Sequence, residues 1–212
     1  MLDYKKQEKH LYPTTTQPSI RVIPRMTFLA VDGRGDPNDP DGAYDNAVES
    51  LYAVAYTLKM SYKGNYQIPG FEQYVVPPLE GLWWLGESDT TVVKANLRWT
   101  SMLRLPDFIR SQDVSWAIET ASAKKKQDFS HVRMFEYDEG MVVQALHRGS
   151  YDTERDSLIG MEMMAAVNHF RIDHQSNRTH HEIYLTDPRK TAPEKTKVIL
   201  RLPLTRATGS PL

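Results

Sequence analysis

The pattern of hydrophobic and polar positions repeats along the chain in two similar passages. Each passage begins with an apolar run typical of a strand, crosses a turn, and continues with helical spacing to about position 62 or 170. The matching segments are Met26–Val31 with Gly42–Asp45 in the first passage, and Met141–Leu146 with Gly149–Asp152 in the second. Further strands are expected after each helix. The repeat predicts an α+β fold in which duplicated β-α-β-β modules form one pseudo-symmetric domain with a central cleft between its halves.

Helical spacing predicts three helices. The apolar positions of the first helix are Tyr44, Val48, Leu51, Val54 and Leu58, which predict one buried face. Those of the helix in the second passage fall on two stripes, Leu158, Met161 and Ala165, and Ile159, Met163, Ala166 and Phe170. We therefore expect that helix to lie deep. A connecting helix is expected from about Gln112 to Lys126, with Trp116 near its start.

Two strands carry tryptophans. In Val93–Thr100 the apolar residues occupy every second position, which predicts one wet face and places Trp99 on the dry one. In Leu82–Leu85 both faces are apolar, so the adjacent Trp83 and Trp84 must point in opposite directions.

The strand expected at His180–Leu185 contains a carboxylate in apolar surroundings. Strand alternation places His181, Ile183 and Leu185 on one face and Glu182 with Tyr184 on the other. We expect the aliphatic face to meet the helices. Glu182 and Tyr184 would then point away from the helices, into the cleft.

The length of 212 residues fits two half-domains that share a core. Residues 1–20 are polar and predict an N-terminal arm, and residues 206–212 predict a tail. The single domain would span 21–205, with a first module at about 21–104, the connecting helix at about 107–126 and the second module at about 131–205.

Composition narrows the class of protein. Lys and Arg number 26 against 27 Asp and Glu, so no direct nucleic-acid contact is expected. No apolar run approaches the roughly 20 residues of a membrane helix, and none is expected to enter a membrane. The chain has no cysteine, in agreement with a cytoplasmic location.

Several familiar signatures are absent. His181-Glu182 begins like a metalloprotease motif, but Leu185 stands where the second histidine is needed. His180 and His181 would point to opposite faces of a strand, so we expect no metal site. The chain also lacks a nucleophile elbow, a phosphate-binding loop and a dinucleotide fingerprint, and no cofactor is expected.

Glu182 has two interpretations. It could reach solvent or pair with an arginine such as Arg201, as most strand carboxylates do. It could instead be a partly desolvated carboxylate among aromatic side chains, available to a cationic ligand or to water. In the second case Tyr184 supplies a hydroxyl for a ligand oxygen. His147 could be a further polar group or make a structural hydrogen bond.

The chain resembles the GyrI-like small-molecule-binding family, particularly its stand-alone branch. The segments that carry the resemblance are Leu11–Pro13, Val31–Asn38, Leu51–Tyr56, Pro78–Trp84, Glu139–His147 and His180–Pro188. One departure is Gly149-Ser150-Tyr151, where relatives often carry Gly-Pro-Tyr.

The resemblance implies concave sheets with helices behind and a ligand groove in front. It implies that Glu182 matches the groove glutamate that holds hydrophobic cations. It also implies that the protein binds hydrophobic, aromatic or cationic small molecules and hydrolyses cyclopropanoid DNA-alkylating compounds by general-base activation of water, since stand-alone relatives include such hydrolases. Glu182 and Tyr184 are then the expected catalytic residues. Trp83, Trp84, Tyr74, Trp116 and His147 are expected to bind ligand. The alternative is a non-catalytic sensor or sink that acts through a protein partner.

Overall fold

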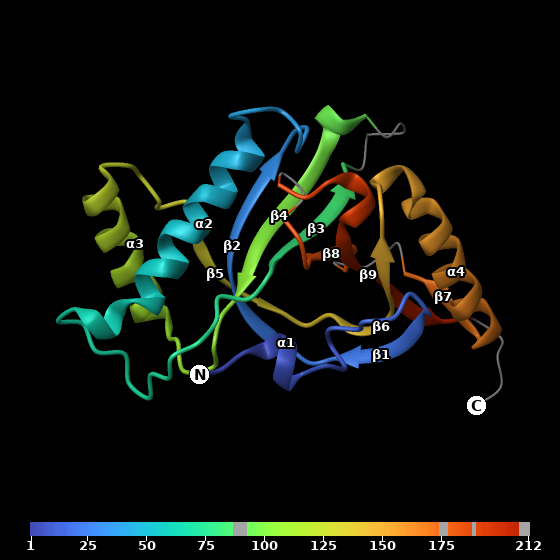
Figure 1. Cartoon of the computed structure of the whole chain (residues 1–212), viewed down its shortest axis with the longest axis horizontal. Coiled ribbons are helices and arrows are strands. Elements are labelled where there is room, and N and C mark those ends of the chain that lie inside the picture. Colours follow the sequence, from blue (N-terminus) through green and yellow to red (C-terminus); the bar gives the residue numbers. More distant parts are fainter. Residues whose placement is uncertain (87–92, 174–177, 188–189, 208–212) are drawn as a thin grey trace. The chain divides into compact units, whose positions relative to one another are not determined.

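A computed structural model of the chain describes residues 1–86, 93–173, 178–187 and 190–207 (Figure 1). Most of the tail predicted at 206–212 lies outside these ranges. The chain forms two compact units. The first comprises Met1–Gln7 and Met26–Tyr137, and the second Glu8–Arg25 and Asp138–Leu212.

The first unit is an antiparallel sheet covered by helices on one face. Its strands are β2 (Met26–Arg34), β3 (Leu79–Leu85), β4 (Leu97–Arg104) and β5 (Arg133–Tyr137), in the order β3-β4-β2-β5. Its helices are α1 (Tyr4–Gln7), α2 (Ala43–Lys59) and α3 (Ser111–Lys125), with 3-10 turns at Ser61–Lys63 and Lys94–Asn96. The core lies between α2 and the sheet, where Leu51, Val54 and Leu58 pack among side chains that include Leu29 and Trp99.

The second unit repeats this plan with one helix. Its strands are β1 (Ser19–Ile23), β6 (Gly140–Arg148), β7 (Phe170–Ile172), β8 (His180–Tyr184) and β9 (Lys197–Arg206). They run in the order β1-β6-β9-β8, and β7 pairs with β9. The helix is α4 (Glu154–Val167), with 3-10 turns at Tyr151–Thr153 and Pro193–Lys195. The duplicated β-α-β-β order is therefore confirmed as β2-α2-β3-β4 and β6-α4-β8-β9, with β7 added.

The outer strand of each sheet comes from an unexpected part of the chain. β1 directly precedes β2 in sequence but pairs with β6, and β5 directly precedes β6 but pairs with β2. Residues expected to form a polar arm therefore include the start of a strand, and Leu11 and Tyr12 are buried.

The prediction of a deeply buried helix in the second passage is wrong. Only Met161 and Ala165 of α4 are buried. Ile159, Met163 and Val167 are 41%, 64% and 73% exposed. The helix therefore packs through one apolar stripe, and its second stripe faces solvent.

The start of the strand expected at Val93–Thr100 is also corrected. The backbone N–H of Asn96 donates to Val93 O at 2.8 Å, which closes a 3-10 turn before β4 begins at Leu97. Trp99 is buried, as the alternation predicted. Its ring lies directly over Gly33, where a Cβ atom would overlap it.

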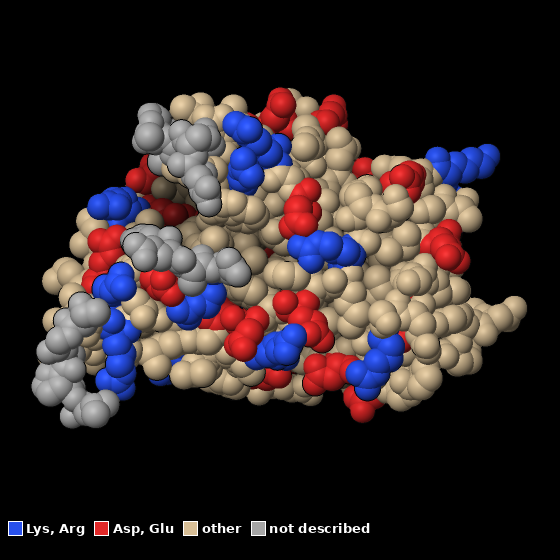
Figure 2. All heavy atoms as spheres, turned by 180° about the vertical axis from the view of Figure 1, so that it is seen from behind, with Lys and Arg blue, Asp and Glu red and all other residues tan. Residues whose placement is uncertain are grey.

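Charged side chains are mixed on the surface. Figure 2 shows Lys and Arg interspersed with Asp and Glu on one face of the molecule, in line with the net charge of −1. Among the described residues, no helix has the length and apolar character needed to cross a membrane.

Candidate functional site

A polar cluster lies on one face of β8. The side chains of His180, Glu182 and Tyr184 share that face because successive strand residues alternate. His180 Nε2 lies 3.0 Å from Glu182 Oε1. Tyr184 is buried, and the side chain of Glu182 retains 13% of its exposure. The cluster is therefore largely shielded from water, and a small part of the Glu182 side chain is exposed.

A second carboxylate joins this cluster from α4. Glu154, the first residue of α4, places Oε1 4.0 Å from His180 Nε2. The ligand atoms of Glu154, His180 and Glu182 all lie within 4.8 Å of one another. We name these three residues the Glu–His–Glu cluster.

The expected orientation of the Glu182 face is wrong. Glu154 belongs to α4, so the face with Glu182 and Tyr184 lies on the helix side of the sheet. His147 shares this face, because both it and Tyr184 pair with Val198, and it contacts Ser157 of α4. The error arose because both faces of this strand carry apolar residues, so alternation separates the faces without saying which one meets the helix.

The environment favours a proton on Glu154 near neutral pH. Burial, followed by the negative charge of Glu182, raises the pKa of Glu154 to about 7, against a smaller opposite effect of His180. Two carboxylates so close together do not both ionise readily. One carboxyl of the pair can therefore hold a proton while the other is charged.

His180 is shifted in the direction that favours its cationic form. Burial alone would lower the pKa of His180, but the hydrogen bond and charge of Glu182, together with the charge of Glu154, raise it overall. A protonated His180 would compensate part of the negative charge of the two carboxylates.

The Glu–His–Glu cluster also has donors suited to a metal ion. Imidazole nitrogen and carboxylate oxygen are common ligands of zinc and other divalent ions. His180 and His181 do lie on opposite faces of β8, as predicted. Glu154 supplies the additional carboxylate that spacing along the sequence could not reveal.

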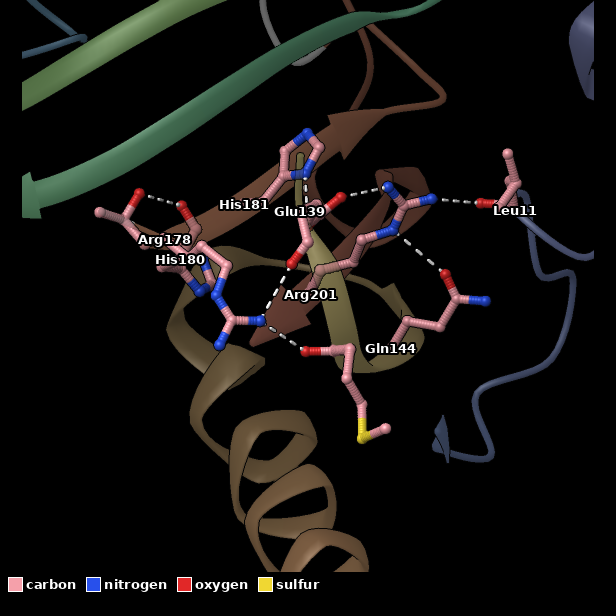
Figure 3. Close-up of polar contacts among 9 residues, drawn as sticks. Leu11, Glu139, Gln144, Arg178, His180, His181 and Arg201 are labelled. Carbon is pink, nitrogen blue, oxygen red and sulfur yellow. Dashed lines mark hydrogen bonds and ion pairs between the residues drawn. The ribbon is translucent and has the colours of Figure 1, made fainter. Parts of the chain in front are cut away.

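A separate ionic network holds the opposite face of β8 (Figure 3). His181 Nδ1 and Arg201 Nη1 each lie 2.8 Å from an oxygen of Glu139. Arg201 also donates to Leu11 O at 2.8 Å and to Gln144 Oε1 at 3.2 Å. Burial would raise the pKa of Glu139, but His181 and Arg201 lower it to about 2. This network ties the N-terminal segment to the sheet, and it uses Arg201 with Glu139 rather than with Glu182.

The candidate ligand residues near β3 divide between its two faces. Trp83 pairs with Trp99 across β3 and β4, and its ring centroid lies 5.4 Å from that of Tyr44 in α2. Trp83 is therefore on the helix side of its sheet. Trp84 lies on the opposite side by alternation. Both are partly exposed.

Two other candidates are enclosed. Tyr74 is 2% exposed, with Phe71 and Phe108 against its ring, and burial raises the pKa of its hydroxyl. This places Tyr74 in the core and not on a surface open to ligand. His147 is 4% exposed, and its two ring nitrogens lie 2.9 Å from Ser157 Oγ and 3.0 Å from Ser150 O. The geometry favours the structural alternative for His147.

Trp116 lies elsewhere in the first unit. Its ring stacks on Tyr66, with centroids 4.0 Å apart and planes 7° from parallel. It borders a surface hollow between α2 and α3.

The duplicated fold, with a shielded acid–base cluster and partly exposed tryptophans, is that of a small-molecule-binding domain. The chain belongs to the GyrI-like family, because the GyrI-like small molecule binding domain matches residues 16–205.

Solved structures agree with this assignment. A hydrolase from Listeria innocua is 43% identical, with a TM-score of 0.88 over 97% of this chain and 100% of that one. An uncharacterized conserved protein from Listeria innocua is also 43% identical, with a TM-score of 0.89 over 97% and 100%. The EcmrR C-terminal domain, at 11% identity and a TM-score of 0.54 over 90% and 98%, shares the fold alone. Comparison with curated proteins gives no match.

Proposed function

We propose that the protein binds hydrophobic, aromatic or cationic small molecules and hydrolyses cyclopropanoid DNA-alkylating compounds, with Glu182 as the general base. The observation that carries this proposal is the Glu–His–Glu cluster, in which Glu182 is held by His180 beside a second carboxyl group. The similarity to a hydrolase from Listeria innocua supports the reaction class.

Activation of water is the first step. Glu182 uses Oε1 to contact His180, which leaves Oε2 to accept a proton from water. The water oxygen forms a bond to a cyclopropane carbon as one strained C–C bond breaks. The electron pair of that bond moves into the dienone and makes it a phenolate. General-base assistance of this kind contributes roughly 10²–10⁴-fold.

Protonation of the phenolate completes the hydrolysis. Tyr184 shares the face of Glu182 and would donate a hydrogen bond to the oxygen as its charge develops. The proton taken from water returns from Glu182 to the product, which equals the substrate plus one water. The pKa of Glu154 is raised to about 7, so near neutral pH this carboxyl is only partly ionised beside Glu182.

The same cluster supports binding of cationic ligands. The two carboxyl groups, of which Glu154 is only partly ionised near neutral pH, carry excess negative charge when His180 is neutral. A lipophilic cation would therefore gain favourable Coulomb energy there, in surroundings with little competing water.

The test is incubation of the protein with a spirocyclopropyl-dienone alkylator, followed over time by mass spectrometry. A product heavier by one water, formed beyond one equivalent and faster than in buffer, supports the hydrolase. Unchanged compound retained by the protein supports the alternative, a sensor or sink. If the protein neither retains the compound nor turns it over, the proposed substrate class is contradicted.

A further inference from the structure

A hollow of about 520 Å³ lies between α2 and α3 in the first unit. Small-molecule sites commonly have volumes of about 300–1,000 Å³, so the hollow can hold a ligand of two or three fused rings. Its space arises because the facing positions carry small side chains, including Ala53 and Thr57 from α2 and Thr120 and Ala121 from α3. We name it the α2–α3 hollow.

Aromatic side chains form its walls. Tyr52 and Tyr56, one helical turn apart on α2, stack with centroids 6.2 Å apart and planes 30° from parallel. Tyr56 is 51% exposed and the neighbouring Met60 is 38% exposed. Trp116 lines the opposite side from α3. Large apolar groups gathered around a surface depression are typical of a binding surface.

The Trp116 wall is fixed in advance. Trp116 stacks on Tyr66, and the Tyr66 hydroxyl donates to Asp113 Oδ1 at 2.8 Å. Asp113 is fully buried, and its Oδ2 accepts from the backbone N–H of Arg110 at 2.7 Å at the start of α3. Because this wall is already ordered, a ligand stacking on Trp116 would lose little side-chain entropy.

The rim carries an excess of positive charge. Lys124 and Lys125 border the hollow, and Lys59 Nζ lies 5.7 Å from the Tyr56 ring centroid. Glu49 is the acidic residue at the rim, and its Oε1 lies 3.7 Å from Lys125 Nζ. Two lysines against one glutamate at the rim, with Lys59 beside the lining residue Tyr56, favour an anionic group at the mouth of the hollow.

We propose that the α2–α3 hollow is a second ligand site, which takes planar aromatic anions. The flat ring system lies between the two tyrosines and Trp116, and the anionic group contacts Lys124 and Lys125. All the residues involved belong to the first unit, so the proposal does not depend on hydrolysis at Glu182.

The test is binding of naphthalene-2-sulfonate to the full chain, measured by calorimetry. Thr120→Trp would fill the hollow, and Lys124→Glu would reverse one rim charge. Each is expected to weaken binding about tenfold or more. The matched charge reversal Lys190→Glu, at a side chain 81% exposed in the second unit, is expected to leave the affinity unchanged.

Thermal unfolding of each variant checks that it remains folded. Weaker binding of the neutral naphthalene-2-sulfonamide would further support the anionic preference. No binding by the wild-type chain would overturn the proposal. The proposal would also be overturned if Thr120→Trp and Lys124→Glu bound the sulfonate as tightly as the wild-type chain does. Tighter binding of a naphthyl cation than of the sulfonate would overturn it as well.

Discussion

His180 and Glu182 project from the same face of β8, with Nε2 and Oε1 3.0 Å apart. Glu154 completes the cluster from the first turn of α4. The neighbouring His181 contacts Glu139 on the opposite face. Two adjacent histidines thus serve two separate ionic systems, one beside the proposed base and one in the core.

The contact between His180 and Glu182 predicts a coupled titration. Because Glu182 raises the pKa of His180 by hydrogen bonding and charge, Glu182→Gln is expected to lower it. NMR titration of the histidine ring protons measures the shift, with the exposed His169 as an internal reference. An unchanged His180 titration would contradict the contact.

Glu154 predicts a dependence of stability on pH. Its folded-state pKa of about 7 exceeds its usual value of 4.5, so the folded carboxyl retains a proton that the unfolded chain has lost. This group therefore reduces the free energy of unfolding as pH rises from about 4.5 to about 7.

Glu154→Gln should remove this decrease in the free energy of unfolding with rising pH. At pH 8 we expect the variant to be more stable by at most about 3 kcal/mol, the free-energy equivalent of the pKa shift. Urea unfolding at pH 5 and pH 8 measures the difference. Glu162→Gln, at an exposed position of α4, is the control and should show no such pH dependence. Equal effects of the two variants would exclude a raised pKa at Glu154.

The buried Glu139 network predicts a loss of stability on the acid side. The pKa of Glu139 is lowered to about 2, so its contribution is present above about pH 4.5 and is lost as pH falls toward 2. Glu139→Gln should cost about 3–5 kcal/mol at pH 7, because it leaves Arg201 buried without its charge partner. The variant should also show a smaller decrease in the free energy of unfolding as pH falls from about 4.5 toward 2.

The exposed pair Lys190–Asp187 provides the control for this network. Lys190→Ala should change the free energy of unfolding by less than about 1 kcal/mol, as expected of a surface pair. Denaturant unfolding between pH 3 and pH 7 measures both variants. Similar costs for the two would show that the Glu139 network contributes no more than a surface ion pair.

Gly33 is predicted to be intolerant of a side chain. Gly33→Ala would place a methyl group inside the Trp99 ring, and displacing that ring should cost about 1–3 kcal/mol. At Gly64 the nearest atom to an added Cβ is Ser61 O at 3.6 Å, an ordinary contact. Gly64→Ala is therefore expected to be nearly neutral in thermal unfolding. Two equally stable variants would contradict the close packing of Trp99 on Gly33.

Much of the fold could be predicted from local patterns. Alternation places Trp99 in the core, and helical spacing gives the register of α2, because each pattern depends on one buried face. The pairing of β1 with β6 and of β5 with β2 could not be predicted in this way. Along the chain, β1 is followed by β2 and β5 is followed by β6, but these neighbours in sequence do not pair with each other. Tertiary packing decides which strands pair.

The candidate site was predictable only in part. Glu182 is conspicuous as a carboxylate in an apolar strand, but its face could not be assigned because His181 and Ile183 are also buried. Glu154 gave no signal, since acidic residues in the first turn of a helix are common where they complement the helix dipole. The cluster forms only when Glu154, at the start of α4, comes close to His180 and Glu182 on β8.

The most direct test of the central claim compares the wild-type chain with Glu182→Gln. Both are incubated with a spirocyclopropyl-dienone alkylator, ligand binding is measured by calorimetry, and the hydrated product is followed by mass spectrometry. We predict that the variant retains binding within a small factor and loses turnover by roughly 10²–10⁴-fold. Full turnover in Glu182→Gln would remove this residue from the chemistry and contradict its role as the general base.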